Sequence, residues 1–374
     1  MQNNSKLVQC STCVMDQSDP DIVFNIDGSC NYCTSYSEEK ERYQLNKLDG
    51  EVKLKSIFDK MKIESRGGKY DCVVGLSGGI DSSYLMLLLK RFNVNPLIVH
   101  VDAGWNSEIA VSNIETLVKH CNFDLITHVV NWESVRKLQI AYFKSGISNL
   151  DVPQDHVFFA VLHKEAVNKN CKYFISGVNY ASEYVFPRGW HGSAMDAINI
   201  KDVWKKHGDG SKLVGYQMIS FLEYKVLFHK RNFKEIRPLN YINYNIRTAI
   251  QELENVGWRS YGRKHGESLF TRFFQNYLLP VRFGYDKRRP HLSSRILAEE
   301  ITREDALRLL SEPLYLASEL EKDTMFICNK LNVDIDFIER CLAGPKKNYS
   351  DYKNWDNLIK MYSYLHNLRK KMFG

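Results

Sequence analysis

Apolar and polar residues alternate in blocks between positions 70 and 178, and the blocks have two different lengths. Four short apolar runs have the length of buried strands: 71–76, 96–102, 123–130 and 172–178. Four longer segments between them carry apolar residues at helical spacing: 82–92, 108–121, 132–144 and 156–169. Strands that alternate with helices of this length predict an α/β fold with a doubly wound parallel sheet.

The pattern changes on either side of this block. A charged, periodic segment at 38–62 predicts a helical connector, and strands largely stop after Pro238. Five later segments read as helices: 267–279, 302–310, 312–332, 334–342 and 355–372. Thr302-x-x-Asp305 opens the second of these as a capping box would. We therefore divide the chain into a module at 1–45, a sheet domain at 46–240 and a mainly helical region at 241–374.

Parallel sheets bind ligands at the carboxyl ends of their strands. Four loops of the predicted sheet share that edge: 77–82, 102–106, 131–132 and 177–183. Asp102, Gly177, Asn179 and Glu183 lie in these loops, so we expect them to contact a nucleotide or another substrate.

The loop after the first strand carries the most specific motif, Ser77-Gly78-Gly79-Ile80-Asp81-Ser82-Ser83. Glycine lets the backbone approach phosphate oxygens, and the following helix N-terminus attracts negative charge. Ser77, Ser82 and Ser83 add hydroxyl donors, and Asp81 can hold a magnesium ion. The motif resembles the PP-loop of ATP pyrophosphatases, which split ATP into AMP and pyrophosphate, and the chain has no Walker sequence. The alternative is a serine-rich turn without a ligand.

Two Cys-x-x-Cys pairs precede the sheet: Cys10 with Cys13, and Cys30 with Cys33. Two such pairs at this separation are typical of a structural zinc site in a ribbon-like module, because they complete a tetrahedron of thiolates. Asp27-Gly28 predicts a hairpin-type turn between them. A redox function of the pairs is the alternative.

Composition narrows the class further. The chain has 374 residues, nine cysteines and a formal net charge of +7. The other five cysteines stand singly in mostly apolar surroundings, which suits a reducing compartment. No apolar run is long enough to span a bilayer, and no signal peptide is recognisable. We expect a cytoplasmic protein with no membrane partner, whose charge suits anionic substrates such as nucleotides.

The segment 261–294 concentrates basic residues, histidines and hydroxyls around glycines. An enzyme that releases pyrophosphate needs cations there, because negative charge accumulates on the leaving group. Lys264, Arg272 and Lys287 are candidate catalytic cations, and Arg288 is a candidate nucleotide contact. His265 and Glu267 are further candidates by position. For any one of them, a solvated basic face or a nucleic-acid patch remains the alternative.

Three segments together resemble the N-acetyl sugar amidotransferases, PP-loop enzymes of bacterial surface-polysaccharide and nonulosonic acid pathways. They are 10–22, the PP-loop with 100–107, and 261–294. The resemblance implies ATP, Mg²⁺ and structural zinc, and a nucleotide-linked N-acetyl sugar as substrate. It also implies a reaction in which the acetamido oxygen attacks the α-phosphate of ATP. Ammonia then displaces AMP from the O-adenylyl imidate and leaves an acetamidino group.

The sequence departs from this family at Gly266, where we expect a bulkier residue. It also lacks a glutaminase nucleophile, because residue 2 is Gln and Gly28-Ser29-Cys30-Asn31-Tyr32 is an incomplete nucleophile elbow. The resemblance therefore implies a separate glutaminase partner, similar to the paired subunits of histidine biosynthesis, that supplies the ammonia.

Two other functions remain open from the sequence. A tRNA-modifying PP-loop enzyme, either a thiolase or a lysidine-type ligase, is compatible with the cysteine module and the positive charge. It is disfavoured by the apolar surroundings of the single cysteines, and we expect no nucleic-acid partner. A non-catalytic nucleotide-sensing scaffold is disfavoured by the intact PP-loop motif.

Overall fold

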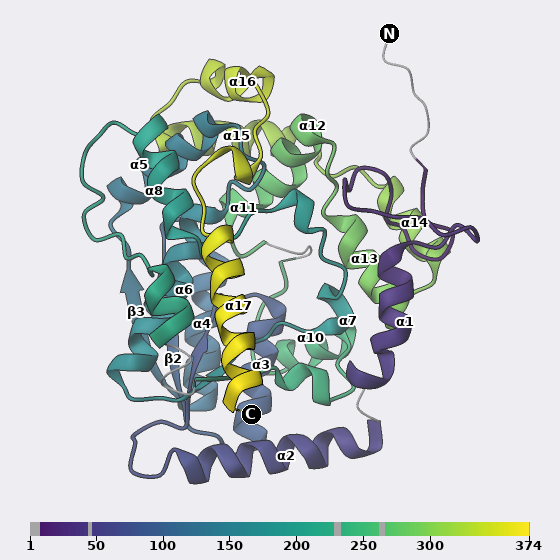
Figure 1. Ribbon diagram of the computed structural model, residues 1–374, viewed down its shortest axis with the longest axis vertical. Helices are drawn as coiled ribbons and strands as arrows, with labels where there is room; N and C mark the ends of the chain where they lie inside the picture. Colours follow the sequence, from purple (N-terminus) through teal and green to yellow (C-terminus); the bar gives the residue numbers. More distant parts are fainter. Residues whose placement is uncertain (1–7, 44–46, 228–232, 262–265, 374) are drawn as a thin grey trace.

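The computed structural model describes residues 8–43, 47–227, 233–261 and 266–373. Its centre is a five-stranded parallel sheet with the order β3-β2-β1-β4-β5 (Figure 1). The strands are β1 (Cys72–Gly75), β2 (Pro96–Asp102), β3 (Asp124–Val129), β4 (Tyr173–Ile175) and β5 (Lys234–Ile236). The predicted parallel sheet is confirmed, with four of its strands close to the predicted bounds. The short β5 was not predicted, because three residues of mixed polarity carry no strand pattern.

Helices cover both faces of the sheet, as a doubly wound fold requires. Alternate residues of a strand point to opposite faces, so Val73 joins one apolar cluster and its neighbour Val74 joins the other. One face packs against α2 (Lys47–Glu64), α3 (Ile80–Arg91), α4 (Glu108–Cys121) and α10 (Ile246–Glu254). The other packs against α5 (Trp132–Ser145), α6 (Val152–Asn168) and α8 (Ala197–His207).

Local sequence explains where these helices begin and end. Ser107 caps α4 by accepting a hydrogen bond from Ala110 N, and Asn131 caps α5 in the same way. Helix α6 begins four residues before its predicted start because Pro153 is accommodated in its first turn. Helix α8 was not predicted, although Asp196 caps it with two backbone hydrogen bonds.

The C-terminal region is helical, as predicted. Its elements are α11 (Leu269–Phe273), the π-helical turn η4 (Phe274–Leu278), α12 (Leu279–Phe283), α13 (Arg288–Leu297), α14 (Arg303–Ser311), α15 (Ala317–Leu331), α16 (Ile335–Ala343) and α17 (Asp356–Phe373). Thr302 caps α14 through Asp305 N, as its sequence predicts. Phe270, Phe273 and Phe274 belong to the same apolar cluster as α5 and α6, so these helices extend the core of the sheet domain.

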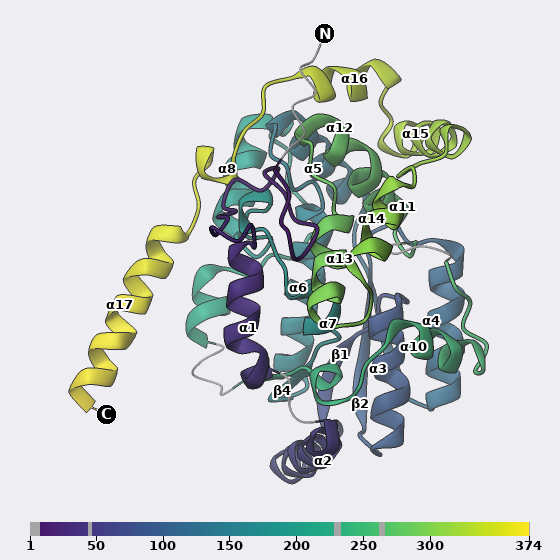
Figure 2. The same ribbon diagram turned by 90° about the vertical axis from the view of Figure 1, so that its right-hand side faces the viewer.

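The N-terminal module carries α1 (Asn31–Tyr43) and lies beside α13 and α14 in both views (Figures 1 and 2). The short helix α7 (Tyr180–Glu183) contacts α13 closely. The remaining short turns are η1 (Arg188–Trp190), η2 (Leu222–Leu227), η3 (Pro238–Tyr241) and η5 (Tyr349–Asp351). Helix α17 extends away from the rest of the chain in Figure 2. None of the described helices is both long and apolar enough to cross a bilayer.

Candidate active site

The loop between β1 and α3 has a backbone shape that favours glycine. Gly78 has a φ of +85°, a left-handed conformation that costs other residues about 1–2 kcal/mol. Ser77 Oγ lies 3.1 Å from Ser82 Oγ and accepts a hydrogen bond from Gly79 N at 3.3 Å. Gly79 is the N-cap of α3 and supplies no side-chain cap. The open start of α3 beside two hydroxyls has the features of a phosphate cradle.

Two aromatic side chains fix this loop. Trp258 Nε1 donates a hydrogen bond to Gly78 O at 3.1 Å, and Tyr261 OH donates to the same oxygen at 2.9 Å. A Cβ on Gly78 would lie 3.0 Å from Ala110 O. A Cβ on Gly266 would lie 2.4 Å from Tyr261 Cβ. The absence of a side chain at 266 therefore leaves room for Tyr261 to reach the loop.

Asp81 joins this loop to the loop after β4. Its Oδ1 accepts hydrogen bonds from Tyr244 OH at 2.5 Å and from Asn179 Nδ2 at 3.2 Å. Burial and the charge of Asp81 raise the pKa of Tyr244, so its hydroxyl stays a donor. Gly177 permits the close approach, because a Cβ there would lie 3.3 Å from Ser82 N. The structure thus brings three predicted site residues together around a carboxylate of the kind that Mg²⁺ prefers.

The end of β2 forms a second hydrogen-bonded group. His100 Nδ1 lies 2.9 Å from Leu76 O, which can only accept, so Nδ1 carries the proton. His100 Nε2 then accepts from Asn106 Nδ2 at 3.0 Å. Asp102 Oδ1 accepts from Gly104 N at 2.7 Å and from Asn106 Nδ2 at 3.2 Å. Asp102 shapes this turn. His100 and Asn106 line the cavity described next. The sequence predicted no function for these two lining residues.

One cavity of about 690 Å³ opens at the carboxyl edge of the sheet, and this volume lies within the usual range for small-molecule sites. Its lining includes Ser77 of the loop with Gly75 and Leu76. It also includes a polar group of residues from the start of α6 and from 271–287, namely Asp151, Gln154, Asp155, Thr271, Gln275 and Lys287. Its apolar lining residues include Phe158, Phe159, Leu162, Val185 and Phe186.

A hydrogen-bond network orders part of this polar group. Gln154 Nε2 donates to Asp151 Oδ1 at 2.6 Å and contacts Thr271 Oγ1 at 2.7 Å. Thr271 Oγ1 also donates to Asp151 Oδ1 at 3.2 Å. Asp151 therefore ties the start of α6 to α11. None of these residues was predicted as a site residue.

Lys287 brings positive charge to the polar group. Its Nζ lies 2.9 Å from His191 Nε2. Burial and the charge of Lys287 hold the pKa of His191 well below its ordinary value, so the neutral ring accepts this hydrogen bond. Glu183 and His291 line the same cavity, and His291 Nδ1 lies 3.0 Å from Ser182 O. The predicted residues Lys287 and Glu183 thus share one cavity with Ser77.

Other predicted residues lie away from the cavity lining. Arg272 forms an ion pair with Asp323 of α15. Arg288 pairs with Asp286 at 2.8 Å and donates hydrogen bonds to carbonyl oxygens of residues 309, 310 and 312 at the end of α14. Ser83 is fully buried, so its hydroxyl points into the protein interior. In this structure these three side chains stabilise or fill the fold.

The remaining candidates of the basic segment divide into two groups. Lys264 and His265 lie outside the described residues. Glu267 lies at the loop itself, because a Cβ on Gly79 would be 3.1 Å from Glu267 Oε1. Backbone pairing of Asn106 with Ser268 holds this segment against the turn after β2. The C-terminal region therefore forms part of the cavity wall beside the phosphate cradle.

The four cysteines of the N-terminal module meet at one point. Their sulfur atoms all lie within 4.8 Å of one another. The Cys10–Cys33, Cys13–Cys30 and Cys30–Cys33 pairs are separated by 3.8, 3.7 and 3.6 Å. A tetrahedron with metal–sulfur bonds of about 2.3 Å has edges of about 3.8 Å. The cluster therefore fits a structural metal, and its spacing suits Zn²⁺.

The N-terminal four-cysteine module supports the cavity wall. Arg303 donates hydrogen bonds to Cys13 O at 3.1 Å and to Cys10 O at 2.9 Å. Arg289 of α13 pairs with Asp16 at 2.9 Å, and Ser293 of the same helix accepts a hydrogen bond from Val14 N. Helix α13 also places Pro290 and His291 in the cavity lining, so the module holds a helix of the candidate site.

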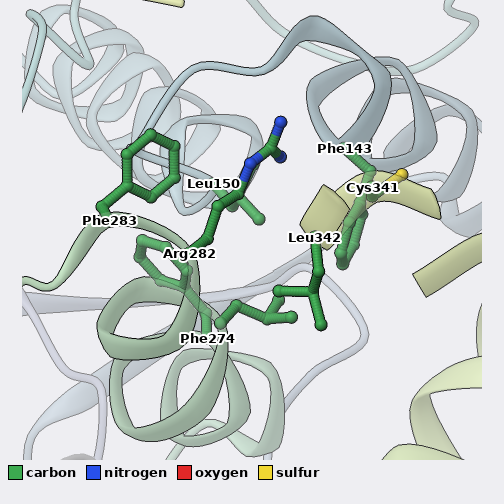
Figure 3. A pocket seen from close by; sticks show the side chains of 8 residues that line it. Phe143, Leu150, Phe274, Arg282, Phe283, Cys341 and Leu342 are labelled. Atoms are coloured by element: carbon green, nitrogen blue, oxygen red, sulfur yellow. The ribbon is translucent and has the colours of Figure 1, made fainter. Parts of the chain in front are cut away.

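A second, small cavity lies between α12 and α16 (Figure 3). Its volume is about 10 Å³, which is room for about one water molecule. Arg282 reaches toward it and donates a hydrogen bond to Pro345 O at 3.0 Å. The other side chains shown are apolar or, in Cys341, a thiol. This cavity is too small for a substrate.

Comparison with known proteins gives partial matches along the chain. The Uncharacterized protein MJ1599 of Methanocaldococcus jannaschii is 31% identical over 122 residues, which is 32% of this chain and 42% of that protein. The chain thus matches less than half the length of this curated relative.

Solved structures that align with the chain have low sequence identity. NMN synthetase from Francisella tularensis has a TM-score of 0.36 and 16% identity, covering 73% of this chain and 98% of that chain. The NH₃-dependent NAD synthetase from Campylobacter jejuni has a TM-score of 0.29 and 16% identity, with coverage of 55% and 92%. The U34-tRNA thiolase NcsA from Methanococcus maripaludis has a TM-score of 0.33 and 15% identity, with coverage of 82% and 89%.

A family model matches the C-terminal part of the chain. The model is described as "LPS biosynthesis protein WbpG-like, C-terminal domain", and the match extends over residues 267–367. It begins at Glu267 beside the loop and includes the cavity residues Thr271, Gln275 and Lys287. Residues 267–367 are therefore similar to the C-terminal domain of WbpG-like LPS biosynthesis proteins.

Proposed function

We propose that this protein is an ATP-dependent amidotransferase that converts the acetamido group of a nucleotide-linked N-acetyl sugar into an acetamidino group. The acetamido oxygen attacks the α-phosphorus of ATP and pyrophosphate leaves. Ammonia then attacks the activated carbon, and AMP departs. The product would serve bacterial O-antigen or surface-glycan biosynthesis, which agrees with the description of the family that residues 267–367 match.

The observation that carries this proposal is the continuity of one cavity. Its volume of about 690 Å³ suits a small-molecule site. Its lining includes both Ser77 of the phosphate cradle and the polar group that contains Asp155 and Lys287. The cradle supplies the donors that a triphosphate needs, and the polar group supplies the mixed donors and acceptors that a sugar needs.

The phosphate cradle and the polar group have different functions in this reaction. The open start of α3, with Ser77 and Ser82, would hold the phosphates of ATP through N–H and hydroxyl donors. Asp81 would hold Mg²⁺, which neutralises phosphate charge when it is bound. Lys287 of the polar group would neutralise negative charge on the substrate, beside the sugar.

The ammonia is proposed to come from a separate glutaminase, because the sequence lacks a glutaminase nucleophile. None of the nine cysteines, all of which lie in the described residues, lines the cavity. The same finding disfavours a thiolase, since transfer of sulfur needs a reactive thiol near the nucleotide. Burial raises the pKa of Cys121 and of Cys171 to about 11, which keeps both thiols protonated at neutral pH.

The test is turnover of the purified chain with ATP, Mg²⁺ and ammonium chloride on a panel of UDP- and CMP-linked N-acetyl sugars. We expect AMP release with one sugar, and mass spectrometry should show the amide oxygen replaced by NH. Release of AMP only when bulk tRNA is added would instead assign a tRNA-modifying function.

A further inference from the structure

The Asp155 side chain differs from that of Asp151, the other acid in the polar group of the cavity lining. It lies one turn into α6 and faces the cavity. Within residues 8–43, 47–227, 233–261 and 266–373, no hydrogen bond or ion pair engages its carboxylate. The side chain is partly exposed to the cavity, so a group that enters the cavity can contact a carboxylate that the described residues leave without a partner.

Asp151, one turn earlier, shows the contrast. Its Oδ1 accepts hydrogen bonds from Gln154 at 2.6 Å and from Thr271 at 3.2 Å. Its Oδ2 accepts from Gln275 Nε2 at 3.4 Å. The chain itself satisfies Asp151, which is therefore a structural acid, and leaves Asp155 to interact with what enters the cavity.

The surroundings of Asp155 suit a proton acceptor. Burial and the negative charge of Asp151 raise its pKa well above the ordinary value, and Lys287 partly offsets this. Tyr216 packs nearby with its hydroxyl donated to Pro153 O at 2.7 Å. The other titratable groups that line the cavity are His100, Glu183, Glu267 and His291.

We propose that Asp155 is the base that accepts the N–H proton of the acetamido group while the acetamido oxygen attacks ATP. This inference rests on the proposed function and assigns the residue that activates its substrate. An amide oxygen is a weak nucleophile, and its attack leaves positive charge on the amide nitrogen unless that nitrogen loses its proton. A carboxylate beside the nitrogen removes this charge as it develops.

The proton balance closes over the two steps. In the first, the bond from the acetamido oxygen to the α-phosphorus forms, and the bond from that phosphorus to pyrophosphate breaks. The N–H proton moves to Asp155, which leaves a neutral O-adenylyl imidate. In the second, ammonia bonds to the imidate carbon and the bond from carbon to the AMP oxygen breaks. Ammonia brings three protons, one of which moves to the sugar nitrogen, and these complete the amidinium product. Asp155 returns its proton to the departing AMP oxygen, which restores the carboxylate.

The alternative use of an acid here is to bind ammonium, and the two functions act in different steps. A base for the acetamido group is needed before ammonia enters, whereas an ammonium site is needed only afterwards. Sugar-dependent exchange of labelled pyrophosphate into ATP, measured without ammonia, reports the first step alone and therefore separates them.

The experiment compares the full chain with Asp155→Asn, Asp155→Glu and the control Glu165→Gln, which changes an acid of the same helix outside the cavity lining. We expect Asp155→Asn to reduce sugar-dependent exchange about 100-fold or more, and Glu165→Gln to leave it unchanged. Binding of a fluorescent ATP analogue and the melting temperature should stay close to wild type in both. Asp155→Glu should recover part of the exchange.

The pH profile gives a second readout. Exchange by the wild type should be lost as pH falls through one ionisation above the ordinary carboxyl range of about 4, because the base must be ionised. The residual exchange of Asp155→Asn should lack this limb. Normal exchange by Asp155→Asn would overturn the inference alone. If that variant showed normal exchange but lost amidine formation, the result would indicate an ammonium site and would also overturn the inference. Absence of sugar-dependent exchange in the wild type would overturn the proposed function and the inference with it.

Discussion

The side-chain amide of Asn179 donates a hydrogen bond of 3.2 Å to Asp81 Oδ1, although the two residues are 98 positions apart. Asp81 follows β1 and Asn179 follows β4, and these neighbouring strands are where the chain reverses its direction along the sheet. Such a switch point separates the helices that follow the two strands and leaves a crevice at their carboxyl ends. The contact therefore joins the two loops that form the candidate site.

Asp81 is expected to be required for turnover and not for folding. Asp81→Asn keeps an oxygen that can accept the hydrogen bond from Tyr244 but removes the charge that Mg²⁺ needs. We expect AMP formation to fall about 100-fold or more, with an unchanged far-UV spectrum.

Tyr244→Phe is the matched control, because it removes a donor to the same oxygen and keeps the carboxylate. It should lower the free energy of unfolding by about 2 kcal/mol, the value of a hydrogen bond to a charged group, and reduce turnover less than Asp81→Asn does. Turnover by Asp81→Asn at the wild-type rate would show that Asp81 does not hold the metal.

Gly78 should tolerate no side chain. Gly78→Ala combines a φ of +85° with a Cβ only 3.0 Å from Ala110 O. Gly284→Ala has nearly the same backbone strain, at φ +79°, with no atom within 4 Å of the added Cβ. We expect Gly284→Ala to cost about 1–2 kcal/mol in urea unfolding and Gly78→Ala to cost more and to weaken ATP binding. An equal loss of unfolding free energy in the two variants would mean that the backbone moves to avoid the contact with Ala110 at no cost.

The sequence predicted the sheet and its edge because both follow from local pattern. Buried strands are continuous apolar runs, and the Ser77–Ser82 motif places its glycines and Asp81 by chain order alone. It did not predict His100, Gln154 or Asp155 as cavity residues, since their importance depends on which distant segments meet. Cavity walls formed by residues 151–155 and 267–291 arise from tertiary packing, and no periodicity in either segment indicates the other.

Charge alone also does not distinguish the basic residues from one another. Arg272 and Lys287 look equivalent in the sequence, yet Asp323 of α15 pairs with Arg272, whereas Lys287 lies in the cavity lining. A cation that neutralises an acid within the fold cannot be told from one that meets a substrate until the acid is located.

Arg272 is accordingly expected to act on stability. Its side chain and that of Asp323 are 20% and 14% exposed, so each single alanine substitution should lower the free energy of unfolding by about 2 kcal/mol, since it leaves the partner charge poorly solvated. The double variant should lose less than the sum of the two. Additive losses, together with reduced pyrophosphate exchange in Arg272→Ala alone, would favour a catalytic function instead.

Removal of the metal should disturb the cavity wall through α13. We expect one zinc per chain by elemental analysis, and loss of this zinc in Cys13→Ser, because a structural site needs all four thiolates. The contacts of Arg289 and Arg303 with the module should weaken, so the melting temperature and sugar binding should both fall. Cys341→Ser, outside the cluster, is the control and should retain the metal. Full zinc content in Cys13→Ser would contradict the four-cysteine site.

His156 should make stability fall in acid. Its Nδ1 lies 2.9 Å from Ala194 O and its Nε2 accepts a hydrogen bond from Ile219 N at 3.2 Å, so the buried ring is neutral. Burial lowers its pKa to about 4, below the value of about 6.5 in an unfolded chain. The unfolded state therefore binds more protons between these values, and stability present above pH 6.5 is lost as pH falls toward 4, by about 3 kcal/mol in total. Urea unfolding at several pH values should show this slope, and His156→Gln should reduce it. An unchanged slope in that variant would assign the acid sensitivity to other groups.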